Sequence, residues 1–123
     1  DPVDGATPQG IAEALARLAR GDLLSAERTA WILSVMMQTK SGPNRMKAAV
    51  PEGWRLAHKT GTGQYWDGRQ SGYNDVGLLF APGGRTYAVA IMVGDTRRSV
   101  PERMAMMQAV VRAVVVFDGV GGG

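Results

Sequence analysis

The chain has 123 residues, of which 45% are hydrophobic and 20% are charged, a length and composition typical of one folded domain or part of one. Having no cysteine and a single histidine, it can form no disulfide and no cysteine or histidine metal cluster, so we expect no metal site and no cofactor. Its net charge of +3 comes from scattered basic residues, and its longest apolar candidate, residues 110–117, contains Arg112, so we expect neither nucleic acid nor a membrane as a partner.

Two helices are predicted in the first part of the chain. Residues 7–21 predict a helix, because threonine and proline favour a helix start, apolar residues recur at helical spacing and a glycine follows. A second helix of about four turns begins near Ser25 and ends before the Ser-Gly-Pro breaker at residues 41–43. Its Trp31 is expected in the core. Residues 44–50 predict a short helix.

Three strands are predicted in the second part. A strand begins near Trp54, where apolar and polar residues start to alternate. Residues 74–81 and 86–93 form an antiparallel hairpin around the Pro-Gly-Gly-Arg turn at 82–85. Residues 62–72 are polar, glycine-rich and aromatic, and they predict an exposed loop.

The last predicted element is a helix over residues 100–117, which packs across the sheet through a group of methionines, Met104, Met106 and Met107. The expected class is α+β: a C-terminal helix on a three-stranded antiparallel sheet, with the two earlier helices as a separate layer. One domain is expected over residues 1–118, helical in 1–50 and with sheet and terminal helix in 54–117. The glycine-rich tail, 119–123, is expected to be flexible.

The most informative stretch for chemistry is His-Lys-Thr-Gly-Thr-Gly at residues 58–63. On a strand, Lys59 and Gly61 face one side and Thr60 and Thr62 the other, while the glycines leave backbone N–H groups open to a ligand. An ammonium, a hydroxyl and free backbone donors suit an anion, with the side chains binding a carboxylate and a backbone N–H holding an oxyanion. The same residues could equally form an ordinary edge strand with a solvated lysine and a glycine bulge.

Lys-Thr-Gly also belongs to the signature of class A β-lactamases and penicillin-binding proteins. Its surroundings extend the match: residues 44–54 lead directly into 57–63, Asn-Asp-Val-Gly at 74–77 opens the next strand, and a closing helix follows. The chain therefore resembles the C-terminal half of a class A serine β-lactamase, starting within the omega loop. The resemblance implies the β-lactamase/transpeptidase-like fold of the α/β three-layer family, hydrolysis of β-lactam antibiotics through an acyl-serine intermediate, and a periplasmic or secreted location.

The resemblance also implies roles for individual residues. Lys59 and Thr60 would bind the carboxylate of the β-lactam, beside Gly61, and Lys59 would also set the potential around the nucleophile. The backbone N–H of Thr62 would be one of two oxyanion-hole donors. Arg45 would reach under the strand and place a second positive charge near the same carboxylate; the alternative is an ordinary surface arginine.

Four further residues have simpler interpretations. Asp4 matches an aspartate that closes the omega loop in the family, but by itself it is an acid preceding a helix. His58 is expected to be packed or hydrogen-bonded rather than a general base. Tyr65 and Trp66 are expected to line the substrate entrance or to serve partner contacts.

The residues that would complete the chemistry are missing from this sequence. No serine is followed by lysine three positions later, and neither Ser-Asp-Asn nor the deacylating glutamate motif is present. We therefore expect the chain alone to be inactive and to need a complementary N-terminal half, as a separate chain or a second copy, because a sheet edge and an apolar helix face would otherwise be uncovered. The alternative is a non-hydrolytic penicillin-binding or interaction module.

Overall fold

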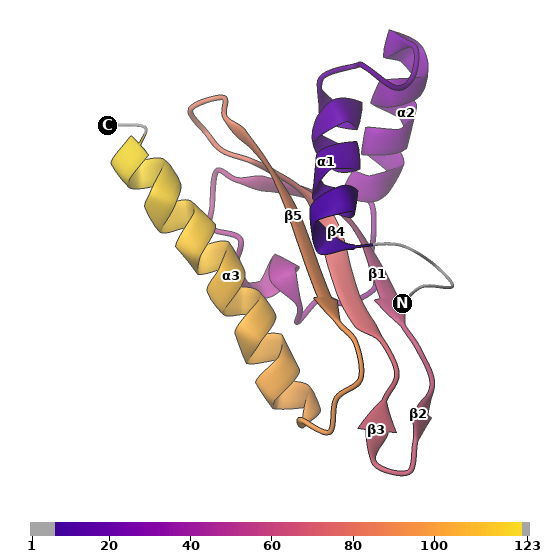
Figure 1. Cartoon of the computed structure of the whole chain (residues 1–123). Helices are drawn as coiled ribbons and strands as arrows, with labels where there is room; N and C mark the ends of the chain where they lie inside the picture. Colours follow the sequence, from indigo (N-terminus) through magenta and orange to yellow (C-terminus); the bar gives the residue numbers. More distant parts are fainter. Residues whose placement is uncertain (1–6, 122–123) are drawn as a thin grey trace.

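The computed structural model describes residues 7–121, which form a three-stranded antiparallel sheet with helices on both faces (Figure 1). In chain order the elements are α1 (Pro8–Ala19), α2 (Ala26–Met37), the 3-10 helix η1 (Met46–Ala49), β1 (Arg55–Thr62), β2 (Tyr65–Trp66), β3 (Arg69–Gln70), β4 (Tyr73–Phe80), β5 (Thr86–Val93) and α3 (Val100–Gly121). The strand order is β1-β4-β5, so β4 is central. α3 covers one face and α1 and α2 lie on the other, which confirms the α+β class.

The first two helices begin where the capping residues predicted. The Thr7 hydroxyl accepts a hydrogen bond from the Gly10 N–H at 3.0 Å, and the Ser25 hydroxyl accepts one from the Arg28 N–H at 3.2 Å. α1 ends before Gly21, whose φ of 81° is a conformation that glycine adopts without strain. α2 has 12 residues, so it is slightly shorter than the four turns expected.

The hairpin β4–β5 and its turn are confirmed, and the Ala81 N–H closes the turn on the Arg85 carbonyl at 2.8 Å. β1 pairs with β4 along its whole length. The two strands approach closely at Gly77, where an added Cβ would lie 2.2 Å from the Ala57 carbonyl oxygen. This position therefore requires glycine.

The main core lies between α3, η1 and the sheet. Its buried members are Met46, Tyr73, Leu79, Val89, Ile91, Met107 and Val111. Of the methionines expected to pack on the sheet, Met107 is fully buried whereas Met106 is 43% exposed. Trp54 packs against this core, with its ring stacked on Tyr87 at a centroid distance of 6.2 Å.

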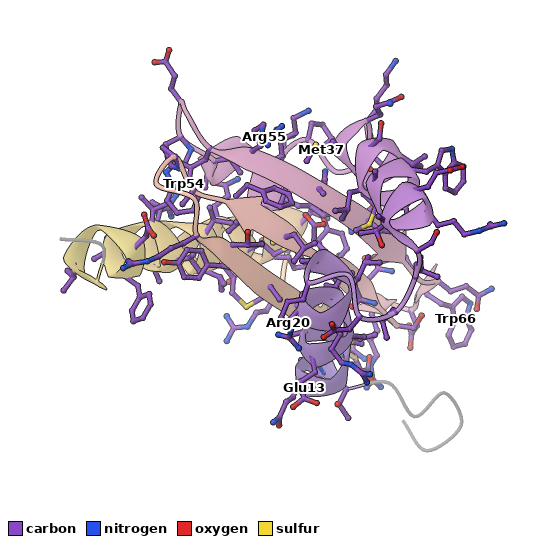
Figure 2. All side chains as sticks on the ribbon, turned by 90° about the horizontal axis from the view of Figure 1, so that it is seen from above. Glu13, Arg20, Met37, Trp54, Arg55 and Trp66 are labelled. Atoms are coloured by element: carbon purple, nitrogen blue, oxygen red, sulfur yellow. The ribbon has the colours of Figure 1, made fainter. Side chains whose placement is uncertain are left out.

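The opposite face of the sheet is covered less completely. None of the residues of α1 is fully buried, and Figure 2 shows Glu13 and Arg20 extending outward from this helix. The expectation that Trp31 belongs to the core is wrong, because its side chain is 66% exposed. Helical spacing identifies the apolar side of α2, but whether another element covers that side depends on the tertiary arrangement.

Residues 62–72 and the start of the glycine-rich tail, both expected to be irregular, are regular in the structure. Within residues 62–72, β2 and β3 form a short ribbon around Asp67 and Gly68, both with positive φ, and Gln70 is buried. This ribbon extends beyond the sheet, with Trp66 at the end far from Trp54 (Figures 1 and 2). α3 continues to Gly121, so residues 119–121 are helical; the Arg85 side chain donates to the Gly121 carbonyl at 2.8 Å.

The expectation that the chain has no segment long and apolar enough to span a membrane is not met by α3. By length and composition alone it is long and apolar enough to cross one, despite Arg112. In the structure this helix packs against the sheet and buries Arg103, Met107 and Val111. Asp4 lies outside the described residues.

Candidate functional site

Lys59 lies on the edge strand β1 beside an apolar groove. The groove has a volume of about 420 Å³ and runs between α1, α2 and the sheet. Lys59 and Val76, which are opposite each other in the register, form its floor. Its remaining lining residues are apolar: Ile11, Ala14, Leu15, Leu18, Leu23, Leu24 and Met36.

The Lys59 side chain is exposed and donates to the Thr60 carbonyl. Among residues 7–121, none of the ion pairs includes it. An exposed ammonium group at an apolar groove, outside the ion pairs that the described residues form, is a suitable partner for an external acid group.

Thr60 points to the other face of β1 and is buried beneath the chain that follows α2. Only 8% of it is exposed, and its hydroxyl lies 2.6 Å from the Ser41 hydroxyl. Gly42 passes so close that an added Cβ would lie 2.6 Å from the Thr60 methyl group. Thr60 and Lys59 are therefore neighbours in the chain whose side chains leave the strand in opposite directions.

Arg45 lies beneath the end of β1 and is only 7% exposed, so the alternative of an ordinary surface arginine is wrong. Its Nη1 donates to the Gly61 carbonyl at 3.1 Å and to the Asn74 carbonyl at 2.8 Å, and its Nη2 donates to the Thr62 hydroxyl at 2.5 Å. Because Gly61 and Asn74 face each other in the register, one guanidinium nitrogen bridges β1 and β4. The guanidinium also lies 3.8 Å from the centroid of the Tyr73 ring.

The structure thus brings the Arg45 guanidinium to the Gly61 carbonyl and the Thr62 hydroxyl at the end of the edge strand. The Lys59 side chain lies on the opposite face of β1 from the Thr62 side chain. The guanidinium donates to protein oxygens in all three contacts, so it braces the strand and adds positive charge below it. Tyr65 and Trp66 continue from this end and are 65% and 79% exposed.

A buried pair, His58 and Asp75, supports the same region. His58 Nδ1 and Asp75 Oδ1 are 2.7 Å apart, and the two residues are 1% and 0% exposed, as the expectation of a packed, hydrogen-bonded histidine required. The second Asp75 oxygen accepts the Met46 N–H at 3.2 Å. Since Met46 follows Arg45, this carboxylate holds the backbone from which the Arg45 side chain extends.

Sequence reasoning missed the role of Asp75, although the strand register contained a signal for it. His58 faces Gly77, and Asp75 is two residues away on the same face of β4, which makes it a diagonal neighbour of His58. A polar residue at such a position suggests a cross-strand partner once the register is known. The register itself is a tertiary property.

Comparison with known proteins agrees with this geometry. The sequence profile of the β-lactamase enzyme family matches residues 3–117. The extended-spectrum β-lactamase PER-1 of Pseudomonas aeruginosa is 33% identical over 110 residues, covering 89% of this chain and 36% of that protein. A β-lactamase of Mycobacterium tuberculosis is 36% identical over 92 residues, covering 75% of this chain and 28% of that protein.

Solved structures extend the comparison to the fold. The TLA-1 extended-spectrum β-lactamase superposes with a TM-score of 0.83 at 28% identity, over 89% of this chain and 40% of that one. The structure of PBP-A superposes with a TM-score of 0.78 at 25% identity, over 93% of this chain and 40% of that one.

An antiparallel sheet between a terminal helix and a helical layer, with Lys-Thr-Gly on the edge strand, defines the β-lactamase/transpeptidase-like fold. The profile match covers nearly the whole chain. The chain belongs to the β-lactamase enzyme family, and the solved structures similar to it include a variant of an ancestral class A β-lactamase. It spans 36% and 28% of the lengths of the two curated relatives described above.

Proposed function

We propose that this chain supplies the carboxylate-binding site and part of the oxyanion site of an enzyme that hydrolyses β-lactam antibiotics through an acyl-serine intermediate. The observation that carries the proposal is the exposed Lys59 ammonium on the edge strand, close to Gly61 and Thr62. The sequence match to named β-lactamases supports it independently.

In this proposal Lys59 attracts the acid group of the drug, and Arg45 strengthens the positive field below the strand. For Thr60 to add a hydrogen bond to the same acid group, the Ser41–Gly42 chain that buries it must move aside, because Thr60 is 8% exposed and its side chain leaves β1 on the opposite face from Lys59. Either hydroxyl can be the donor between Thr60 and Ser41. If Ser41 donates, the Thr60 proton is free for a carboxylate, since a hydroxyl both donates and accepts. The backbone N–H of Thr62 holds the oxyanion that develops as the lactam carbonyl is attacked.

The attacking serine, its lysine and the deacylating glutamate must come from a complementary N-terminal half, because this chain has no Ser-x-x-Lys motif. Two features support such a partner. The groove beside Lys59 is open and lined by apolar side chains, and Leu23, Leu24, Trp31 and Val35 are exposed on or near the same helices. Sedimentation tests this part, since a well-folded monomer of the chain alone would argue against the requirement.

Hydrolysis of nitrocefin tests the proposal directly. The chain alone should show no turnover, and turnover should appear when the complementary half is supplied. Lys59→Met should weaken substrate capture by about one to two orders of magnitude, the worth of a charge-assisted hydrogen bond. Lys47→Met, which removes another exposed lysine, is the matched control and should leave kcat/KM unchanged. Equal effects of the two changes would contradict the assignment.

The alternative is a non-hydrolytic penicillin-binding module, which the similarity to PBP-A favours. In that case the complemented protein would form a stable acyl adduct with benzylpenicillin, visible by mass spectrometry, without turnover. We also propose a periplasmic or secreted location, which cell fractionation tests.

A further inference from the structure

The backbone just after the proposed oxyanion donor is held by a buried amide side chain. Gln70, on β3, is 4% exposed, and its Nε2 donates to the Gly63 carbonyl at 2.6 Å and to the Gln64 carbonyl at 3.3 Å. The Gly63 N–H in turn donates to the Gly72 carbonyl at 2.8 Å. The peptide groups on both sides of Gly63 are therefore restrained, one residue beyond Thr62.

Gly63 has little room to move. A Cβ added to it would lie 2.7 Å from the Ser71 hydroxyl and 3.1 Å from the Gly72 nitrogen. Close backbone approach and a short side-chain hydrogen bond thus fix the same residue. A change in Gln70 is transmitted to Gly63, because no side chain of Gly63 can compensate for it.

Gln70 is itself oriented from α3. Arg103 is 3% exposed, and its Nη1 donates to Gln70 Oε1 at 3.2 Å while its Nε donates to the Arg98 carbonyl at 2.8 Å. A guanidinium can only donate, so the Gln70 oxygen must face Arg103 and the amide nitrogen must face Gly63. The backbone of Gln70 is held as well, by a two-way bridge to Thr96.

Arg103 and Arg45 also lie against the same aromatic ring, that of Tyr73. The Arg103 guanidinium lies 5.1 Å from the centroid of the Tyr73 ring, and the Arg45 guanidinium lies 3.8 Å from the same centroid. One side chain of α3 therefore contacts the residues that support both Gly63 and Arg45.

We infer that Gln70, oriented by Arg103, is a positioning residue for the Thr62–Gly63 backbone, so that α3 sets where the oxyanion donor points. This inference rests on the proposed function for the role of Thr62. Oxyanion donors act only at about 2.7–3.1 Å from the developing charge, and an error of about 1 Å costs on the order of 100-fold in rate. Gln70 should thus affect kcat far more than KM.

Gln70→Glu separates positioning from packing. Glutamate keeps the shape and accepts the Arg103 hydrogen bond, but it has no donor for the Gly63 carbonyl. In the complemented enzyme we expect kcat for nitrocefin to fall about 10- to 100-fold with KM changed less than about twofold. Gln38→Glu, the same charge change at an exposed glutamine just after α2, is the control and should leave both parameters unchanged. A wild-type kcat for Gln70→Glu would overturn the inference.

Amide hydrogen exchange in the complemented protein tests the inference without a measurement of catalysis. The Gly63 amide should exchange at least about tenfold faster in Gln70→Glu than in wild type, while amides in the centre of β4 keep their protection. Unchanged protection of Gly63 would refute the positioning role. If Gln70→Glu does not fold, both measurements are made on Gln70→Met, which removes the side-chain N–H donor to the Gly63 carbonyl without adding a charge. Absent turnover in the complemented wild type would refute the proposed function, and exchange would still decide the role of Gln70.

Discussion

Replacing Arg45 by methionine should destabilise the fold by about 3 kcal/mol, because the change removes the bridge between β1 and β4 while keeping most of the side-chain volume. The guanidinium makes three hydrogen bonds and stacks on Tyr73, and it is 7% exposed. Losing one hydrogen bond to a charged group costs about 1.5–3 kcal/mol, and a desolvated cation–π contact contributes about 2 kcal/mol. These contributions do not add, since all four contacts share one guanidinium, and the change also removes the cost of burying a charge; with water reaching the exposed Thr62 hydroxyl, the net loss is about 3 kcal/mol.

Urea unfolding followed by circular dichroism measures this loss as a lower midpoint at an unchanged m-value. For a domain stable by about 5–15 kcal/mol, the expected shift is large. Arg55→Met is the matched control: Arg55 is exposed on the same strand, 5.7 Å from the Phe80 ring centroid, and its replacement should cost less than about 0.5 kcal/mol. Arg45→Lys should fall between the two, since lysine keeps the charge but lacks the planar fork. An Arg45→Met variant as stable as Arg55→Met would show that the bridge contributes nothing.

Three further predictions concern the supports of the sheet and of α3. Asp75→Asn should lower the free energy of unfolding by about 2–3 kcal/mol, because the buried carboxylate accepts from both His58 and the Met46 N–H; a urea midpoint equal to wild type would contradict this. Gly77→Ala should abolish cooperative unfolding or lower its midpoint sharply, because the new Cβ would lie 2.2 Å from the Ala57 carbonyl oxygen, and an unchanged thermal transition would exclude that contact. Hydrogen bonds from Ser99 lower the pKa of Glu102 below its usual value, so its contribution is complete above the unfolded-state pKa and is lost as the pH falls through the folded-state pKa. Glu102→Gln should therefore show less loss of stability on acidification than wild type, and parallel pH profiles would refute this.

Much of the fold was predictable because its signals are local. Thr7 and Ser25 cap helices through hydrogen bonds to residues three positions away. The Pro-Gly-Gly-Arg turn forces β4 and β5 into a hairpin, and alternation marked β1. Such interactions depend on neighbouring residues alone, so the sequence predicts them before any packing is known.

Burial was less predictable. The apolar side of α2 was visible in its spacing, yet Trp31 on that helix is 66% exposed. Likewise Gln70 looked like part of a polar loop, but β3 and α3 bury it. Helical or strand period identifies which side chains share a face, whereas coverage of that face depends on elements distant in the chain.

The candidate site also has one part that the sequence predicted and another that depended on the tertiary structure. Residues 58–63 are contiguous, so the sequence alone determined that a lysine, a threonine and two glycines lie together along and just after a strand, although the Gly63 N–H expected to be open is bonded to the Gly72 carbonyl. Only the tertiary structure decided that Arg45 passes beneath that strand, that Asp75 pairs with His58, and that Gln70 holds Gly63. The reason is physical: hydrogen bonds between residues 17 or 29 positions apart form only once strand register and helix docking bring their atoms within about 3 Å.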